Sequence, residues 1–199
     1  FKPCGALEKI KNQLLALFFN LILILGHFTI IPFIAPYMEL NIGLSSREIT
    51  YIYLVGGLLT AILLPLVGKL SDRYGHPLVF TIASIAALGS IFWVTNLQVV
   101  SLWFTLLATS SFFVVASGRN VPALTMVTSV VPPENRGSFM SVRSSIQEAG
   151  LALSALIAGF IVVEDVDGKL LHYDYAGYVA IGMSILAALL AWRLKVVDA

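Results

Sequence analysis

The chain has 199 residues, of which 58% are hydrophobic and 12% are charged. Because soluble domains carry about 25% charged residues, this composition excludes an ordinary water-soluble fold. The formal net charge of +1 argues against a nucleic-acid partner. Cys4 is the only cysteine, which excludes a disulfide within the chain.

Long apolar runs recur along the chain, and each is long enough to cross a bilayer, which takes about 17–25 residues. The sequence therefore predicts an all-α membrane protein surrounded by membrane lipid. Six runs qualify, at residues 13–37, 49–67, 78–94, 99–130, 138–163 and 175–194. We divide the chain into a cytoplasmic linker segment at residues 1–12 and a six-span domain at residues 13–199.

The segment before the first span is basic, with Lys2, Lys9 and Lys11. It is either a helix on the membrane surface or a disordered linker, and its composition fits both. Within the first span, Pro32 and Pro36 predict a kink near the outer end, because proline removes a backbone hydrogen-bond donor.

Signals for helix ends and helix contacts appear further along. Ser45 and Glu48 have the spacing of a capping box, which predicts the start of the second span. The glycine pair at residues 56–57 suits close helix packing. In the fifth span, a stripe of small residues predicts a second helix contact, at Gly150, Ser154 and Ala158.

A short polar stretch, GKLSDRYGHP at residues 68–77, separates the second span from the third. We interpret it as a hairpin in which Gly75 supplies the positive φ of a tight reversal. Gly68 would let the end of the helix approach a neighbour closely. A carboxylate at Asp72 can face the positive N-terminal end of another helix, so the hairpin could act as a latch.

This stretch resembles the loop motif of the major facilitator superfamily, whose pattern is G-x-x-x-D-R-x-G-R-R/K. The residues that match are Gly68, Asp72, Arg73 and Gly75, whereas His76 and Pro77 stand where the family prefers basic residues. PPENRG at residues 132–137 resembles the family's loop between the fourth and fifth spans of a half.

The resemblance covers nearly the whole chain and implies half of a facilitator, with six helices built as two inverted three-helix repeats. It points to the sugar-efflux and drug:proton antiporter branch, and both ends of the chain resemble a carboxy-terminal half. The implied partners are a small solute, protons, and the missing six-helix half or a second copy of this chain. The chain starts at Phe1, and we expect further residues upstream.

Lysine and arginine are unequally divided between the two sides of the predicted spans. Lys69, Arg73 and Arg136 fall on the side of both termini, whereas Arg47 and Lys169 fall on the other. The positive-inside rule therefore predicts a multi-pass protein of the cell (inner) membrane with cytoplasmic termini.

Glu148 is the sharpest functional candidate among the polar residues of the spans. It lies about 15 Å into the fifth span at 1.5 Å per residue, a depth at which an ionisable group is costly and usually functional. It could carry protons, or it could pair with Arg143, five residues earlier, and both alternatives stay open. Gln147 is a weaker candidate for the solute pathway.

Three further polar residues could line the pathway. Arg119 resembles the fourth-span arginine of the family's helix motif and could bind an anionic solute, but we favour snorkelling to the cytoplasmic face. His27 could titrate or contact the solute, but we favour a neutral, hydrogen-bonded role within the bundle. Asn20 is either a pathway residue or a helix-to-helix hydrogen-bonding residue.

The sequence offers no sign of an enzyme, a cofactor or a metal site. His27, His76 and His172 are scattered along the chain, and no glycine-rich phosphate-binding loop is present. We therefore expect a secondary active transporter of the facilitator type, performing proton-coupled efflux of a sugar-like or drug-like solute by alternating access. The alternative is a six-span membrane scaffold without transport activity.

Overall fold

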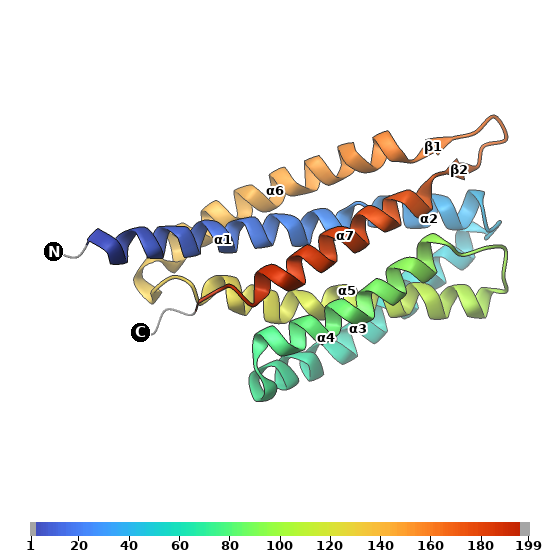
Figure 1. The fold of residues 1–199 in the computed structure, drawn as a ribbon. Helices are drawn as coiled ribbons and strands as arrows, with labels where there is room; N and C mark the ends of the chain where they lie inside the picture. Colours follow the sequence, from blue (N-terminus) through green and yellow to red (C-terminus); the bar gives the residue numbers. More distant parts are fainter. Residues whose placement is uncertain (1–2, 196–199) are drawn as a thin grey trace.

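The computed structural model describes residues 3–195, and Lys2 of the predicted basic segment lies outside them. The helices and strands are α1 (Pro3–Phe28), α2 (Ile31–Leu40), α3 (Ser46–Tyr74), α4 (His76–Thr95), α5 (Leu102–Thr128), a 3₁₀ turn η1 (Pro133–Asn135), α6 (Arg136–Ile161), β1 (Val163–Glu164), β2 (Leu170–Leu171) and α7 (Tyr173–Ala191) (Figure 1). The prediction of six spans is confirmed, because six helical segments are long and apolar enough to cross a membrane. α1 and α2 together form the first of them.

The first span is broken rather than kinked. A turn at residues 29–30 separates α1 from α2. Pro32 explains the position of this break, because it has no N–H to donate to the carbonyl of Phe28 one turn earlier. Pro36 lies inside α2 without ending it. The prolines therefore disturb the first span near its outer end, as predicted, but they break the helix where the sequence predicted only a kink.

α3 starts with the predicted capping box and then runs further than predicted. The N–H of Ser45 donates to the Glu48 carboxylate at 2.8 Å, and the N–H of Glu48 donates to the Ser45 hydroxyl at 3.4 Å. The helix continues to Tyr74, so the prediction of a hairpin loop over residues 68–77 is wrong. Only Gly75, with φ +92°, separates α3 from α4, because the polar residues before it are compatible with helix.

The helices form an arc with α3 at one end and α6 at the other. α5 packs between α3 and α4, α7 contacts α4 and α1, and α6 packs on α1. The start of α1, the end of α7 and the α3–α4 turn lie at one end of the bundle, and the β1–β2 hairpin lies at the opposite end (Figure 1). α3 and α6 are the least buried of the six spans.

Glycine sets the contact between α3 and α5. A Cβ atom at Gly56 would lie 2.6 Å from Cδ2 of Phe113, which confirms that close packing requires glycine there. Gly57 has no neighbour within 4 Å of such an atom, so its predicted packing role is wrong. The close approach predicted at Gly68 is also wrong, because an added Cβ would lie 3.9 Å from Val121, an ordinary contact distance.

The predicted stripe of small residues on α6 packs against α1. A Cβ atom at Gly150 would lie 3.0 Å from Cδ1 of Leu21, and Ser154 and Ala158 are buried on the same face. This part of the prediction is confirmed. The stripe therefore fixes which side of α6 faces the bundle.

Two asparagines tie the first span to the last part of the chain. The Asn41 amide donates to the Leu170 carbonyl at 2.8 Å and accepts from the Leu170 N–H at 2.9 Å. At the opposite end, the Asn12 amide donates to the Lys195 carbonyl at 2.6 Å and accepts from the Lys195 N–H at 3.0 Å. Each asparagine thus makes the two hydrogen bonds that a neighbouring strand would make.

Candidate functional site

A buried polar cluster lies where α1, α5 and α7 meet. Arg119 on α5 is only 1% exposed and donates to the hydroxyl of Ser184 on α7 at 2.8 Å. Its other terminal nitrogen lies 3.2 Å from Nδ1 of His27 on α1. The favoured interpretation that Arg119 snorkels to the cytoplasmic face is therefore wrong. The contact of His27 agrees with the favoured hydrogen-bonded role.

This cluster holds a positive charge with no carboxylate beside it. Because a guanidinium only donates, Nδ1 of His27 accepts, and the ring proton is on Nε2. The one ion pair among the described residues joins Lys195 to Glu8 at the end of the bundle. Nε of Arg119 also has no hydrogen-bond partner among them. A buried cation with a free donor favours an additional acceptor, which would offset the cost of desolvation.

A second polar contact joins α1 to α6. Nε of Arg143 donates to Oδ1 of Asn20 at 3.1 Å, and Asn20 is buried. Arg143 therefore does not form an ion pair with Glu148, and the alternative in which this arginine neutralises the glutamate is wrong. Asn20 has the helix-to-helix contact that the sequence left as one of two possibilities.

α6 presents two different exposed faces. The first carries large apolar side chains, namely Val142, Leu153, Leu156 and Phe160. The second, which we call the polar face of α6, follows the spacing of one helix side and consists of Gly137, Ser141, Ser144, Glu148, Ala152, Ala155 and Gly159. Glu148 is exposed near the middle of the helix, and Gln147 beside it is half-buried.

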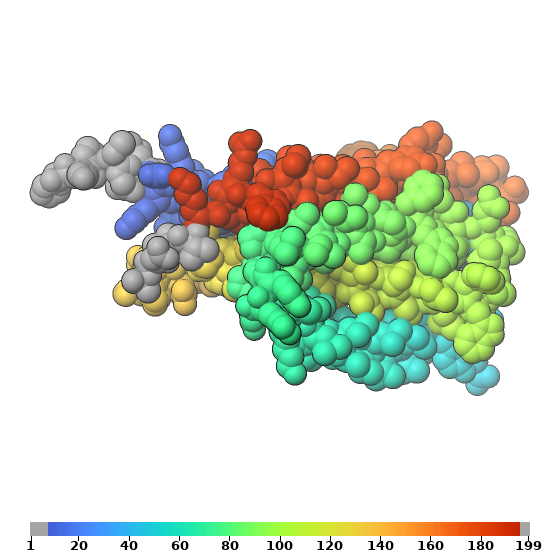
Figure 2. Space-filling view, turned by 60° about the horizontal axis from the view of Figure 1, so that its bottom comes forward, coloured from blue at the N-terminus to red at the C-terminus, as the bar shows by residue number. Residues whose placement is uncertain are grey.

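α4 and α7 form a contrasting surface. They lie side by side in the face shown in Figure 2, and their large exposed side chains suit hydrocarbon. These side chains include Leu78, Ile82, Ile85, Phe92, Trp93, Ile185, Leu186, Leu189 and Trp192. An ionisable group at mid-helix is costly in lipid, so the polar face of α6 belongs against water or another protein surface.

The polar motif at the end of α3 is partly tied into the bundle. Nδ1 of His76 lies 2.6 Å from the hydroxyl of Ser71, which is buried. His76 thus links the start of α4 to the end of α3 although it replaces a basic residue of the motif. The Arg73 guanidinium lies 5.4 Å from the centre of the Tyr74 ring. Asp72 is exposed and free to contact a surface outside this bundle.

Sequence reasoning missed Ser184, because nothing in the sequence tells which residue an arginine 65 positions away will reach. Its one signal is that it is the single serine within the apolar run of α7. Across the described residues, no group of three His, Cys, Asp or Glu side chains lies together in a way that could hold a metal ion.

Comparisons with known proteins show which family this chain belongs to. The family model described as Major Facilitator Superfamily matches residues 16–199. The lincomycin resistance protein LmrB of Listeria monocytogenes is 23% identical over 146 residues, which are 73% of this chain and 30% of that protein. LmrB of Listeria innocua matches with the same identity and coverage. The match therefore covers less than a third of the length of these curated relatives.

Solved structures share the fold at low sequence identity. The inward-open xylose transporter XylE from E. coli has a TM-score of 0.70 at 13% identity, covering 94% of this chain and 48% of that one. A D-xylose-proton symporter has a TM-score of 0.67 at 14% identity, covering 96% and 48%. The predicted fold, half of a facilitator, is thereby confirmed. With its six apolar spans and a family match over nearly its whole length, the chain is a multi-pass membrane protein that belongs to the Major Facilitator Superfamily.

Proposed function

We propose that this chain is one half of a secondary active transporter that moves a small solute by alternating access. Membership of the family supports this proposal, and so does the match to 48% of each transporter structure. In such folds the solute site lies near the bilayer midplane, between two halves. The second half is then either a further part of the same polypeptide or a second copy of this chain.

The polar face of α6 is the observation that carries the proposal. It places an exposed carboxylate, Glu148, halfway along a span, on a face without large apolar side chains. A scaffold that only had to be stable in lipid would gain nothing from a carboxylate at this depth. A translocation pathway between two halves gives that carboxylate water and a solute to contact.

Glu148 is the group that we assign to proton coupling. Its position lets it exchange protons with a water-filled pathway, and within the described residues it forms no ion pair. Arg119, His27, Arg143, Asn20 and Gln147 form the remaining candidate pathway set. Because Arg119 and Arg143 are cationic and face the bundle, they favour a solute with acceptor oxygens.

The direction and the solute class come from relatives and are proposals. The name of LmrB, a lincomycin resistance protein, points to efflux of a drug-like compound. The two xylose transporters share only the fold, so a sugar-like solute stays a second possibility. We place the start of α1 and the Gly75 turn on the cytoplasmic side of the cell membrane, following the positive-inside rule.

The test is flux through the complete protein that contains this chain, reconstituted in liposomes with an imposed pH gradient. Lincomycin and xylose are the two probes. One of them should accumulate when the pH gradient is present, and its accumulation should stop when the gradient is collapsed. Glu148→Gln should abolish the gradient-driven flux but retain exchange of labelled for unlabelled solute, because binding survives the loss of coupling.

Glu134→Gln is the matched control, since Glu134 is an exposed glutamate in η1 at the end of the bundle. It should behave as the parent protein. Gradient-driven flux of Glu148→Gln equal to the parent rate would overturn the assignment of Glu148. A correctly folded protein with neither flux nor exchange of either probe would favour the scaffold.

A further inference from the structure

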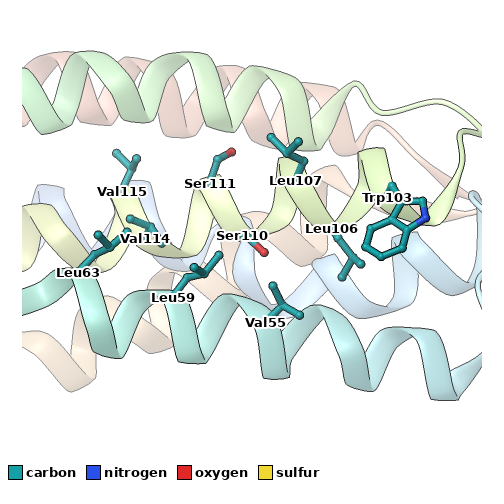
Figure 3. A pocket seen from close by; sticks show the side chains of 10 residues that line it. All are labelled: Val55, Leu59, Leu63, Trp103, Leu106, Leu107, Ser110, Ser111, Val114 and Val115. Atoms are coloured by element: carbon teal, nitrogen blue, oxygen red, sulfur yellow. The ribbon is translucent and has the colours of Figure 1, made fainter.

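A groove runs along the side of the bundle that faces away from α1 and α6. α3 and α4 meet at the Gly75 turn and diverge toward the opposite end, and α5 forms the floor between them (Figures 2 and 3). The cavity in this groove has a volume of about 520 Å³. Its walls include Val55, Leu59 and Leu63 of α3, and its floor includes Ser110 and Val114 of α5.

The surroundings of the groove are apolar and suit the hydrocarbon of a bilayer. α4, which lies along its edge in Figure 3, exposes large apolar side chains such as Ile85. Trp103, at the mouth of the groove, is 78% exposed in the first turn of α5, as expected for a side chain at a membrane interface. From Trp103 to Val115 the floor extends about 18 Å at 1.5 Å per residue, which stays within one leaflet and a little more.

One group in the groove does not match an apolar chain. Ser110 is 4% exposed, and its hydroxyl has no hydrogen-bond partner among the described residues. The neighbouring Ser111 hydroxyl, by contrast, donates to the Ala108 carbonyl at 2.7 Å. Since Ser110 lies about 12 Å below the start of α5, a phospholipid offers only methylene groups at its depth, and these leave the hydroxyl unsatisfied.

We propose that this groove binds an apolar small molecule taken up from the bilayer, with one oxygen or nitrogen that hydrogen-bonds to Ser110. The apolar walls provide burial, and the hydroxyl provides the single polar contact that fixes the position of the ligand. The site lies on a different side of α5 from the Arg119 cluster, since Arg119 reaches α1 and α7 while the cavity is lined by α3 and α5. It is therefore distinct from the proposed translocation pathway and does not depend on transport.

The experiment is photolabelling of the full protein in nanodiscs with a dodecanol that carries a diazirine next to its hydroxyl-bearing carbon. Mass spectrometry should find label on α3 around residues 55–63 and on α5 around residues 103–115. Ser110→Ala should lower this labelling by about 2- to 10-fold through loss of one hydrogen bond. Leu59→Trp, which fills the groove, should remove it, and size-exclusion chromatography establishes that each variant is folded.

Two controls separate the groove from general contact with lipid. Ser111→Ala should label as the parent does, because that hydroxyl is already satisfied within α5. Ile185→Trp changes an exposed side chain of α7, which does not line the groove, and should also leave the label in place. Equal labelling of Ser110→Ala and the parent would overturn the proposal, as would labelling spread evenly over α4 and α7. Stronger labelling by a diazirine phospholipid, unaffected by Ser110→Ala, would assign the groove to a lipid chain and equally overturn it.

Discussion

Gly177 should be the position at which a single methyl group does most damage to the contact between α7 and α4. A Cβ atom there would lie 2.8 Å from Cβ of the buried Thr95, an atom that no side-chain rotation can move. Overpacking of this kind costs about 1–3 kcal/mol. Replacing a mid-helix glycine by alanine also stabilises the helix by about 0.5–1 kcal/mol, so the measured loss in Gly177→Ala alone understates the steric cost.

Gly182→Ala removes that ambiguity. Gly182 lies in the same helix and has no neighbour within 4 Å of an added Cβ, so it gains the helix term without the clash. The difference between the two variants should therefore be about 1–3 kcal/mol. For a chain of this size, that corresponds to about 2–12 °C in the midpoint of thermal unfolding in detergent. Equal midpoints, or a more stable Gly177→Ala, would refute the packing argument.

Three other changes test separate parts of the structure. Asp72→Asn should shift the complete protein toward the inward-open state and slow turnover, because the hypothesised latch would lose a charge-assisted hydrogen bond worth about 1.5–3 kcal/mol. Unchanged transport and unchanged cysteine accessibility on the cytoplasmic side would contradict the latch. Single cysteines at residues 69–76 and 164–172, introduced into a Cys4→Ser background, should be labelled from opposite sides of the membrane, and labelling from one side would exclude six spans. Asn41→Ala should raise the hydrogen-exchange rate of the Leu170 amide at least about fivefold through loss of two hydrogen bonds. Gln98→Ala should leave that rate unchanged, because the Gln98 side chain is exposed and makes no hydrogen bond among the described residues.

The sequence carried enough information for the spans, because apolar runs and punctuating residues act locally. Pro32, Ser45 and Gly75 each determine what their own backbone can do, and each marks a helix boundary in the structure. The polar residues between Gly68 and Gly75 led to the wrong prediction of a loop, because polarity indicates the end of the bilayer and not the end of a helix. α3 continues past the apolar layer until Gly75 adopts a positive φ.

The candidate site was less accessible to such reasoning. Whether Arg119 snorkels or stays buried depends on which side of α5 faces α1 and α7. The rotation of α5 is set by contacts on its other side, such as that of Phe113 with Gly56 of α3. Its partner Ser184 comes from another helix altogether. The stripe of small residues on α6 was visible in the sequence and fixed the orientation of Glu148 by exclusion, since residue 148 cannot face α1 when residue 150 does.

The two asparagine contacts have a mechanical consequence for the first span. Asn12 and Asn41 hold its two ends to the last part of the chain, while the turn at residues 29–30 lacks continuous helical hydrogen bonding. Because both ends of the first span are held, we expect it to bend at the turn at residues 29–30. His27 lies within one helical turn of residues 29–30 and contacts Arg119. Bending the first span there would therefore change the distance between these two side chains.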